Sequence, residues 1–216
     1  MEFLVSVSGN DFMMNDLAKK MAAKDPFYKQ YVDRPFRGNM NTSTIKTNMG
    51  RTIMLQHDVT SPRPKSDGFV ISGTKATAIE FPENKICVAK EATPETWRGS
   101  DAQVWLSNDD YKALEKKYTP NIVKKLGEIA KQVGFHGDGH DFLMDWRTID
   151  CLHNGLPLDQ DVYDAALWSS IGPLSEWSVK NNSTSIKIPD FTKGSWKTNA
   201  PVDIALEKGG NTKVKI

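Results

Sequence analysis

The chain has 216 residues, of which 28 are basic and 27 acidic, so its formal net charge is +1. This balance excludes the one-sided basic surface that is expected of a nucleic-acid-binding protein. No apolar run approaches the roughly 18 residues that a membrane-spanning helix needs. The two cysteines, Cys87 and Cys151, are too few for a disulfide framework or a cysteine-based zinc site, and both fall in apolar patterns typical of a core.

The first ninety residues are dominated by short segments of β-forming residues separated by turns. Residues 3–7 predict a strand, and residues 15–23 predict a helix that ends before Asp25-Pro26, because the residue before a proline disfavours helical backbone. Residues 27–39 predict an irregular connection. Alternation with a period of two then predicts strands over the ranges 44–47, 52–57, 68–73, 76–81 and 86–88. Hairpin-linked strands of this kind favour a largely antiparallel sheet.

Helical periodicity replaces this pattern in the second half of the chain. Ser107 is a predicted cap, and helices are expected over the ranges 109–118, 121–133, 141–154 and 159–170. Strands gathered first and helices later indicate an α+β fold. We expect one domain, with 1–90 mainly sheet, 107–179 mainly helices and 180–216 a polar tail with short strands, such as one at 185–188.

A loop rich in glycine and histidine precedes the third of these helices. Residues 134–140 contain three glycines and two histidines, and so many glycines indicate a backbone with positive φ or with a close approach to another group. Asp141 is the predicted N-cap of the helix, and Gly155 is its predicted C′ residue. A plain solvated connection fits this composition. However, an imidazole titrates near neutral pH, so His136 and His140 at a helix N-terminus favour a binding or catalytic loop.

Several familiar motifs are absent from the sequence. No strand is followed by Gly-x-Gly-x-x-Gly, and there is no Gly-x-x-x-x-Gly-Lys-Ser/Thr, His-Glu-x-x-His or Gly-x-Ser-x-Gly. The chain therefore holds no complete dinucleotide-binding fold of its own. His136 and His140 have a metal-ligand spacing only on a helix, and the glycines between them argue against a helix, so we expect no metal site.

Two longer segments carry a resemblance to a known family. Residues 141–147 (DFLMDWR) and 154–166 (NGLPLDQDVYDAA) resemble the C-terminal half of glycoside hydrolase family 109, the NAD-dependent α-N-acetylgalactosaminidases of the Gfo/Idh/MocA superfamily. The likeness extends over the ranges 41–45, 57–58, 61–64, 72–75, 168–170, 173–179, 189–194 and 196–198. It covers nearly all of this chain but only the C-terminal portion of the family.

The resemblance implies a fold and a set of partners. The fold is the Gfo/Idh/MocA C-terminal domain, a largely antiparallel (mixed) open sheet with helices packed on one face. The partners are NAD, a sugar substrate similar to an N-acetylgalactosaminide, and the NAD-binding half of the same protein, which this chain lacks. Homo-oligomerisation through the open sheet face is a further expectation, because an exposed apolar face usually marks an interface.

Two departures from the family pattern affect the expected site. The family places a histidine four residues before Asp141, where this chain has Gly137, so either His136 or His140 takes that role. The family also tends to have a tyrosine after Pro-Arg-Pro, where this chain has Lys65. We expect His136 and His140 as catalytic residues, and the following as substrate-binding residues: Asp141, Arg63, Lys65 and Asp138.

The function that follows from the resemblance is hydrolysis assisted by redox chemistry. NAD oxidises a ring hydroxyl, the glycosidic oxygen leaves by elimination, water adds and the hydride returns, which is an exception to the two-carboxylate scheme. Alone, the domain is expected to be inactive, and to supply sugar positioning and a proton-handling imidazole. The alternatives are a sugar oxidoreductase of the same fold and a catalytically inactive oligomerisation module.

Overall fold

The computed structural model describes residues 1–58, 60–62, 64, 67–89, 104–134, 139–198 and 205–208. The chain forms two compact units. The first comprises Met1–Pro62, Arg147–Asp203 and Glu207–Ile216, and the second comprises Arg63–Trp146 and Ile204–Leu206. None of the helices in these described ranges is long and apolar enough to cross a membrane.

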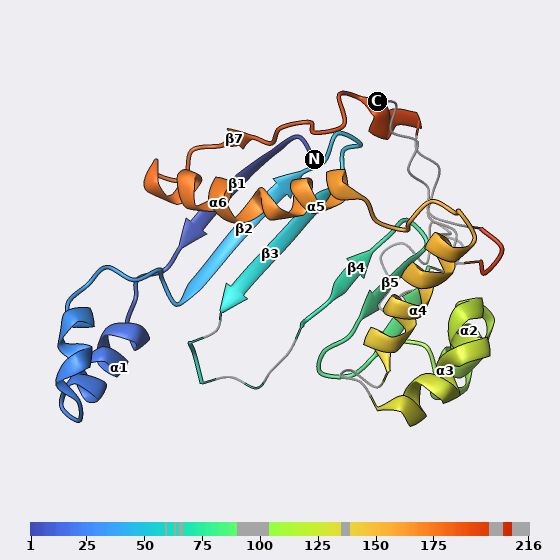
Figure 1. Ribbon diagram of the computed structural model, residues 1–216, viewed down its shortest axis with the longest axis horizontal. Coiled ribbons are helices and arrows are strands. Elements are labelled where there is room, and N and C mark those ends of the chain that lie inside the picture. The colour runs from blue at the N-terminus through green and yellow to red at the C-terminus, as the bar shows by residue number, and fades with distance from the viewer. Residues whose placement is uncertain are drawn as a thin grey trace. The chain divides into compact units, whose positions relative to one another are not determined.

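The first unit is built on a four-stranded sheet with the order β3-β2-β1-β7 (Figure 1). The strands are β1 (Phe3–Ser8), β2 (Met40–Lys46), β3 (Thr52–Asp58) and β7 (Ile186–Lys187), and each neighbouring pair is antiparallel. The predicted hairpin is confirmed, with Gly50 at a φ of 79° in its turn. The β-forming residues of the polar tail add β7 beside β1, so the predicted tail strand is also confirmed.

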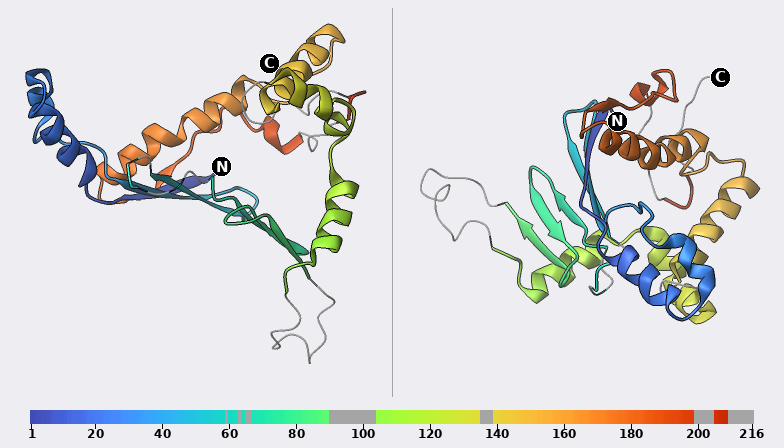
Figure 2. Two further views of the ribbon diagram at one scale, coloured as in Figure 1. Left: turned by 90° about the horizontal axis from the view of Figure 1, so that it is seen from below. Right: turned by 90° about the vertical axis from the view of Figure 1, so that its left-hand side faces the viewer.

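One face of this sheet forms the core of the first unit. Leu4 and Ile45 are opposite each other in the β1–β2 register and are fully buried, and Ile188 is buried beside them. Helix α6 (Ile171–Lys180) lies along this face, and α5 (Val162–Ser169) precedes it (Figure 2). The partly buried side chains packed against the core are Met1, Leu167, Ile171, Leu174 and Ile186. The expected open sheet with helices on one face is therefore confirmed in this unit. Val7 and Met54, on the opposite face, are exposed.

Buried hydroxyls link α6 to the sheet in what we call the serine chain. The side chain of Ser178 accepts a hydrogen bond from the backbone N–H of Ser6 at 3.0 Å and donates to the carbonyl of Thr184 at 2.8 Å. The Oγ atoms of Ser6 and Ser43 are 2.9 Å apart, and those of Ser43 and Ser175 are 2.8 Å apart. All four serines are buried. A hydrogen-bonded row of this kind fixes the position of α6 on β1 and β2, because each hydroxyl would be costly to leave unpaired.

The segment between β1 and β2 forms α1 (Met13–Ala22) and a 3-10 helix, η1 (Pro26–Tyr31). The predicted first helix is confirmed, whereas the prediction of an irregular connection is wrong over η1. Asp25 caps this 3-10 helix by accepting a hydrogen bond from the N–H of Phe27 at 2.8 Å, and proline suits the first turn. The rings of Phe27, Tyr28 and Tyr31 then meet at centroid distances of 5.3–6.4 Å.

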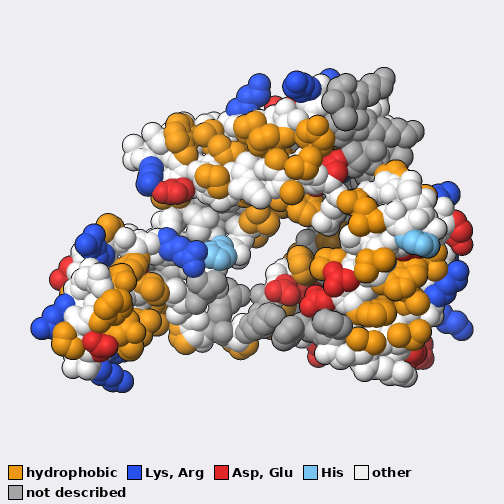
Figure 3. Space-filling view, viewed as in Figure 1, with side chains coloured by type: hydrophobic (Ala, Val, Ile, Leu, Met, Phe, Trp, Pro, Cys, Tyr) orange, Lys and Arg blue, Asp and Glu red, His pale blue; other side chains and the backbone are white. Residues whose placement is uncertain are grey.

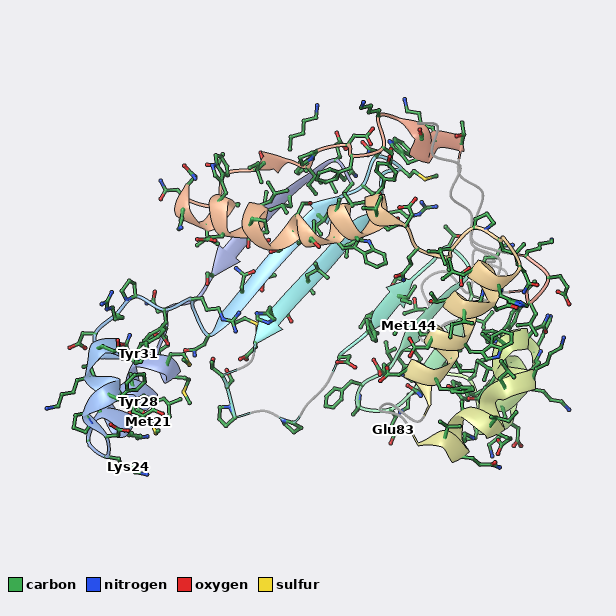
Figure 4. The ribbon with its side chains drawn as sticks, in the orientation of Figure 1. Met21, Lys24, Tyr28, Tyr31, Glu83 and Met144 are labelled. Atoms are coloured by element: carbon green, nitrogen blue, oxygen red, sulfur yellow. The ribbon has the colours of Figure 1, made fainter. Side chains whose placement is uncertain are left out.

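Hydrophobic side chains are exposed on this helical segment. Figure 3 shows hydrophobic atoms gathered over α1 and η1, and Figure 4 shows Tyr28 of η1 beside Met21 of α1. The large apolar side chains exposed here are Phe12, Met13, Leu17, Phe27 and Tyr31.

The second unit contains a three-stranded sheet with the order β4-β5-β6. Its antiparallel strands are β4 (Val70–Ser72), β5 (Ala76–Ile79) and β6 (Lys85–Val88), of which β4 and β5 are shorter than predicted. Two helices follow, α2 (Asn108–Tyr118) and α3 (Asn121–Val133), both close to their predicted bounds. Helix α4 (His140–His153) begins in this unit, and its residues from Arg147 on belong to the first unit. The α+β class is confirmed.

The serine chain generates a test of stability. Replacing Ser43 with Ala removes the hydroxyl that joins Ser6 to Ser175. The Ser6 hydroxyl keeps its bonds to Asn41, but the buried hydroxyl of Ser175 loses this partner, so we expect the free energy of unfolding to fall by about 1–3 kcal/mol. Urea unfolding followed by circular dichroism measures the change. Ser185→Ala is the control, because Ser185 is exposed, and it should have little effect. Equal midpoints for the two variants would contradict the assigned role of the serine chain.

Candidate functional site

A glycine lies on each side of residues 135–138 in the histidine loop. Helix α3 ends at Val133 and is followed by its C-cap Gly134, whose φ of 74° is left-handed, and Gly139 has a φ of 89° directly before α4. The prediction that glycine shapes this loop is confirmed at both positions, because L-residues with a side chain rarely adopt such values. Between them, residues 135–138 lie outside the described residues, and with them the predicted site residues His136 and Asp138.

Gly139 also packs directly against α3. A Cβ atom at this position would lie 2.5 Å from the carbonyl carbon of Ala130 and 2.6 Å from its oxygen. Ala130 is buried, and the carbonyl of Gly139 accepts a hydrogen bond from the N–H of Leu143 at 3.1 Å. Backbone therefore packs on backbone at this point, and the start of α4 is held against the end of α3. No residue other than glycine fits this contact.

His140 and Asp141 occupy the first turn of α4. The helix begins at His140, one residue earlier than predicted, so the prediction that Asp141 is the N-cap is wrong: Asp141 lies inside the helix, half-buried. The physical reason is that Gly139 supplies the non-helical residue before the helix and its carbonyl accepts the first helical hydrogen bond. The carboxylate of Asp141 still lies near the positive end of the helix dipole. The imidazole of His140 is exposed, where it can contact a ligand.

The predicted residues Arg63 and Lys65 lie outside the described residues, but the segment that leads to them is well anchored. The Asp58 carboxylate accepts hydrogen bonds from the N–H groups of Thr60 at 3.1 Å and Ser61 at 3.0 Å. The side-chain amide of Asn39 donates to the hydroxyl of Thr60 at 2.6 Å. Our sequence reasoning missed these anchors, although an aspartate two or three residues before Thr and Ser is a known turn pattern.

A buried arginine on α4 was also missed. Arg147 donates two hydrogen bonds to the carboxylate of Asp159, at 3.0 and 3.3 Å, and one to Asp150 at 3.2 Å. It also donates to the carbonyl of Lys208. Burial lowers the pKa of the Arg147 guanidinium, but the hydrogen bonds and charge of Asp159 outweigh this effect, so its pKa is raised overall. This ionic cluster ties the residues after α4 to the helix; only the i, i+3 spacing of Arg147 and Asp150 signals it in the sequence.

The cysteine on α4 is not a reactive group. Cys151 is fully buried, and burial raises the pKa of its thiol, so the thiolate needed for nucleophilic attack is disfavoured. Its predicted role as a small core residue is confirmed. Among the described residues, no group of three or more His, Cys, Asp or Glu side chains could hold a metal ion.

The helix end that follows is as predicted. Helix α4 stops at His153, and Gly155 adopts a φ of 63° at C′. The N–H of Leu156 bonds to the carbonyl of Cys151 at 2.8 Å, which is the long hydrogen bond of a Schellman motif. The described part of the site therefore consists of the front of α4, with His140 and Asp141 at its first turn and Gly139 behind them.

Comparison with known proteins gives a consistent match. The sequence profile described as "Glycosyl hydrolase 109, C-terminal domain" matches residues 1–198. The chain is 45% identical to a glycosyl hydrolase family 109 protein of Shewanella woodyi over 168 residues, which are 77% of this chain and 35% of that protein. It is 40% identical to one of Solibacter usitatus over 200 residues, 92% of this chain and 42% of that protein. A third relative, family 109 protein 2 of Akkermansia muciniphila, is 38% identical over 88% of this chain and 38% of its own length. The chain thus spans about two fifths or less of these relatives.

The Gly139 contact can be tested by substitution. Gly139→Ala combines a left-handed backbone with a backbone clash against Ala130, so we expect a loss of stability of about 3 kcal/mol or more. Gly134→Ala is the matched control: its backbone is equally left-handed, but no atom of the described residues lies within 4 Å of the added Cβ, so only about 1 kcal/mol should be lost. Urea midpoints measure both variants, and equal losses would show that the approach to Ala130 is unimportant.

The ionic cluster of Arg147 generates a separate prediction. Asp159→Ala leaves a buried guanidinium without its two-pronged partner, and breaking such a pair costs on the order of 3 kcal/mol. Asp145→Ala, which changes an exposed carboxylate on the same helix, should change stability by less than about 0.5 kcal/mol. Thermal unfolding measures the two, and an unchanged melting temperature for Asp159→Ala would contradict the prediction.

Proposed function

Because the chain belongs to glycosyl hydrolase family 109, of which it is the C-terminal domain, we propose that it is the substrate-side domain of a glycosidase that acts on an N-acetylgalactosaminide-like sugar. The observation that carries the proposal is the glycine-bounded loop at the front of α4. There a close backbone contact sets an exposed imidazole at a helix N-terminus. The relatives extend well beyond the part that this chain matches.

The described residues do not themselves fit an NAD site. A dinucleotide fold needs parallel strands joined by crossover helices, whereas every strand pair in the described part of the chain is antiparallel. We therefore assign NAD to the remaining part of the family protein. Oxidation of a ring hydroxyl and return of the hydride, the chemistry that NAD supplies in our proposal, belong to that part.

The residues of this chain bind the sugar and move a proton. The imidazole of His140 is exposed at the first turn of α4, so it is placed to act as a general acid or base beside a sugar C–H or hydroxyl. The carboxylate of Asp141 accepts hydrogen bonds from sugar hydroxyls, helped by the N–H groups of the same helix turn. His136 is the second candidate for the proton transfer. Arg63, Lys65 and Asp138 complete the proposed substrate contacts.

Product analysis tests the reaction type. This chain, joined to the NAD-binding part of its family, should release the aryl alcohol from an aryl α-N-acetylgalactosaminide with no net formation of NADH, because the hydride returns to the sugar within each turnover. Absorbance of the aryl alcohol and of NADH, followed together, measures both. Steady accumulation of NADH would contradict the proposed glycosidase activity and support the sugar oxidoreductase.

Single substitutions in the same joined protein identify the proton-transfer residue. One of the two variants, His136→Ala or His140→Ala, should lower turnover by about 10²–10⁴-fold, because it lacks the residue that transfers the proton. The other variant should have a smaller effect. His153→Ala is the matched control, because His153 is exposed at the far end of the same helix, and it should retain activity. Full turnover in both loop variants would remove the histidine loop from the mechanism.

A further inference from the structure

The second unit has a hollow of about 270 Å³ that the proposed mechanism does not use. Its described lining comes from β4, β5, β6, the residues flanking them and α2. The volume is slightly below the roughly 300–1,000 Å³ of drug-sized sites, so it suits a ligand the size of a single ring.

A small residue at the centre of the sheet creates this hollow. Ile71, Ala78 and Ile86 lie directly opposite one another on β4, β5 and β6, so their side chains project from the same face. The single methyl group of Ala78 between two isoleucines leaves a depression in the middle strand. The floor of the hollow is therefore apolar.

Two aromatic rings border this floor. Phe69 lies two residues before Ile71 and so on the same face, and its side chain is 62% exposed. On the other side, the N–H of Leu106 bonds to the carbonyl of Ile86 at 2.8 Å and aligns the start of α2 with β6. Ser107 caps α2 by accepting from the N–H of Asp110 at 3.2 Å, and Tyr111 lies one turn further on, lining the hollow.

Polar groups at the rim remain free to bind. Within the described part of the chain, the amide of Asn84 and the hydroxyl of Tyr111 make no side-chain hydrogen bond, and Glu80 accepts only a long one, from the N–H of Phe69 at 3.4 Å. By contrast, the ammonium group of Lys85 pairs with the carboxylate of Glu83 at 3.2 Å. The rim thus offers a carboxylate, an amide and a phenol around an apolar floor.

We propose that this hollow is a second, non-catalytic binding site for one pyranose ring. A pyranose has an apolar C–H face, which would lie on Ala78 and against the ring of Tyr111, and hydroxyls at its edge, which would bond to Glu80 and Asn84. A wholly apolar occupant would instead cover the Glu80 carboxylate without giving it a partner, which is unfavourable. The choice of a sugar rests on the glycosidase function proposed above.

The test is a titration of the 216-residue chain, labelled with ¹³C at its Ile and Ala methyl groups. Methyl α-N-acetyl-D-galactosaminide is the probe. We expect saturable shifts of the Ile71, Ala78 and Ile86 methyl signals, with a dissociation constant of about 1–10 mM. Ala78→Leu fills the hollow and Tyr111→Ala removes one wall, so each should weaken binding by about tenfold or more, which corresponds to about 1.4 kcal/mol.

Matched variants separate this site from a general loss of structure. Tyr118→Ala changes an exposed tyrosine on the same helix and should leave the dissociation constant unchanged. Glu80→Gln removes only the rim charge, at an exposed position, so it tests the site even if Ala78→Leu does not fold. The absence of methyl shifts at 50 mM probe, equal binding by Tyr111→Ala and Tyr118→Ala, or a larger response to cyclohexanol than to the sugar would each overturn the proposal.

The outcome is independent of the activity test. Sugar binding in the hollow without turnover of the aryl glycoside would support this binding site and contradict the proposed glycosidase activity. Turnover without such binding would contradict the proposed binding site and support the glycosidase activity.

Discussion

The contact between Gly139 and Ala130 is the constraint on which the candidate site depends. Two helices that follow each other along the chain meet backbone to backbone, and the space left for a Cβ atom is smaller than any side chain can use. Helix α4 must therefore begin at His140, next to the buried Ala130 of α3. Within the part of the chain that the structure describes, the position of the imidazole follows from this backbone contact, and the ring is exposed.

Much of this arrangement could be predicted because it is encoded locally. Alternating residues in 44–57 identified the β2–β3 hairpin, and glycine signals identified the loop and the end of α4, where Gly134, Gly139 and Gly155 all have positive φ. The one-residue error at the start of α4 has the same origin. Asp141 has the chemistry of a cap, but the close approach that makes Gly139 the preceding residue involves α3, and local preferences do not report it.

The parts that could not be predicted depend on residues far apart in the chain. Ser6 bonds to Ser178 across 172 positions, and Ser43 to Ser175 across 132, so no window of sequence reveals that these hydroxyls meet. Nothing in the composition distinguishes Arg147 from a solvated arginine either; its burial becomes evident only when Asp159 lies beside it. Serine and arginine are usually surface residues, and sequence reasoning assigns them there unless the fold is known.

The first unit is ordered by buried polar groups that are paired with one another. An apolar core such as that of Leu4, Ile45 and Ile188 tolerates small shifts of a helix along a sheet, whereas the serine chain does not, because each hydroxyl has one geometry that pairs it. In the second unit the polar groups of interest are exposed instead, at His140 and around the hollow by Tyr111. Groups that hold the fold together are already paired within the protein, whereas the groups of the proposed binding sites are exposed, so the two tasks fall to different residues.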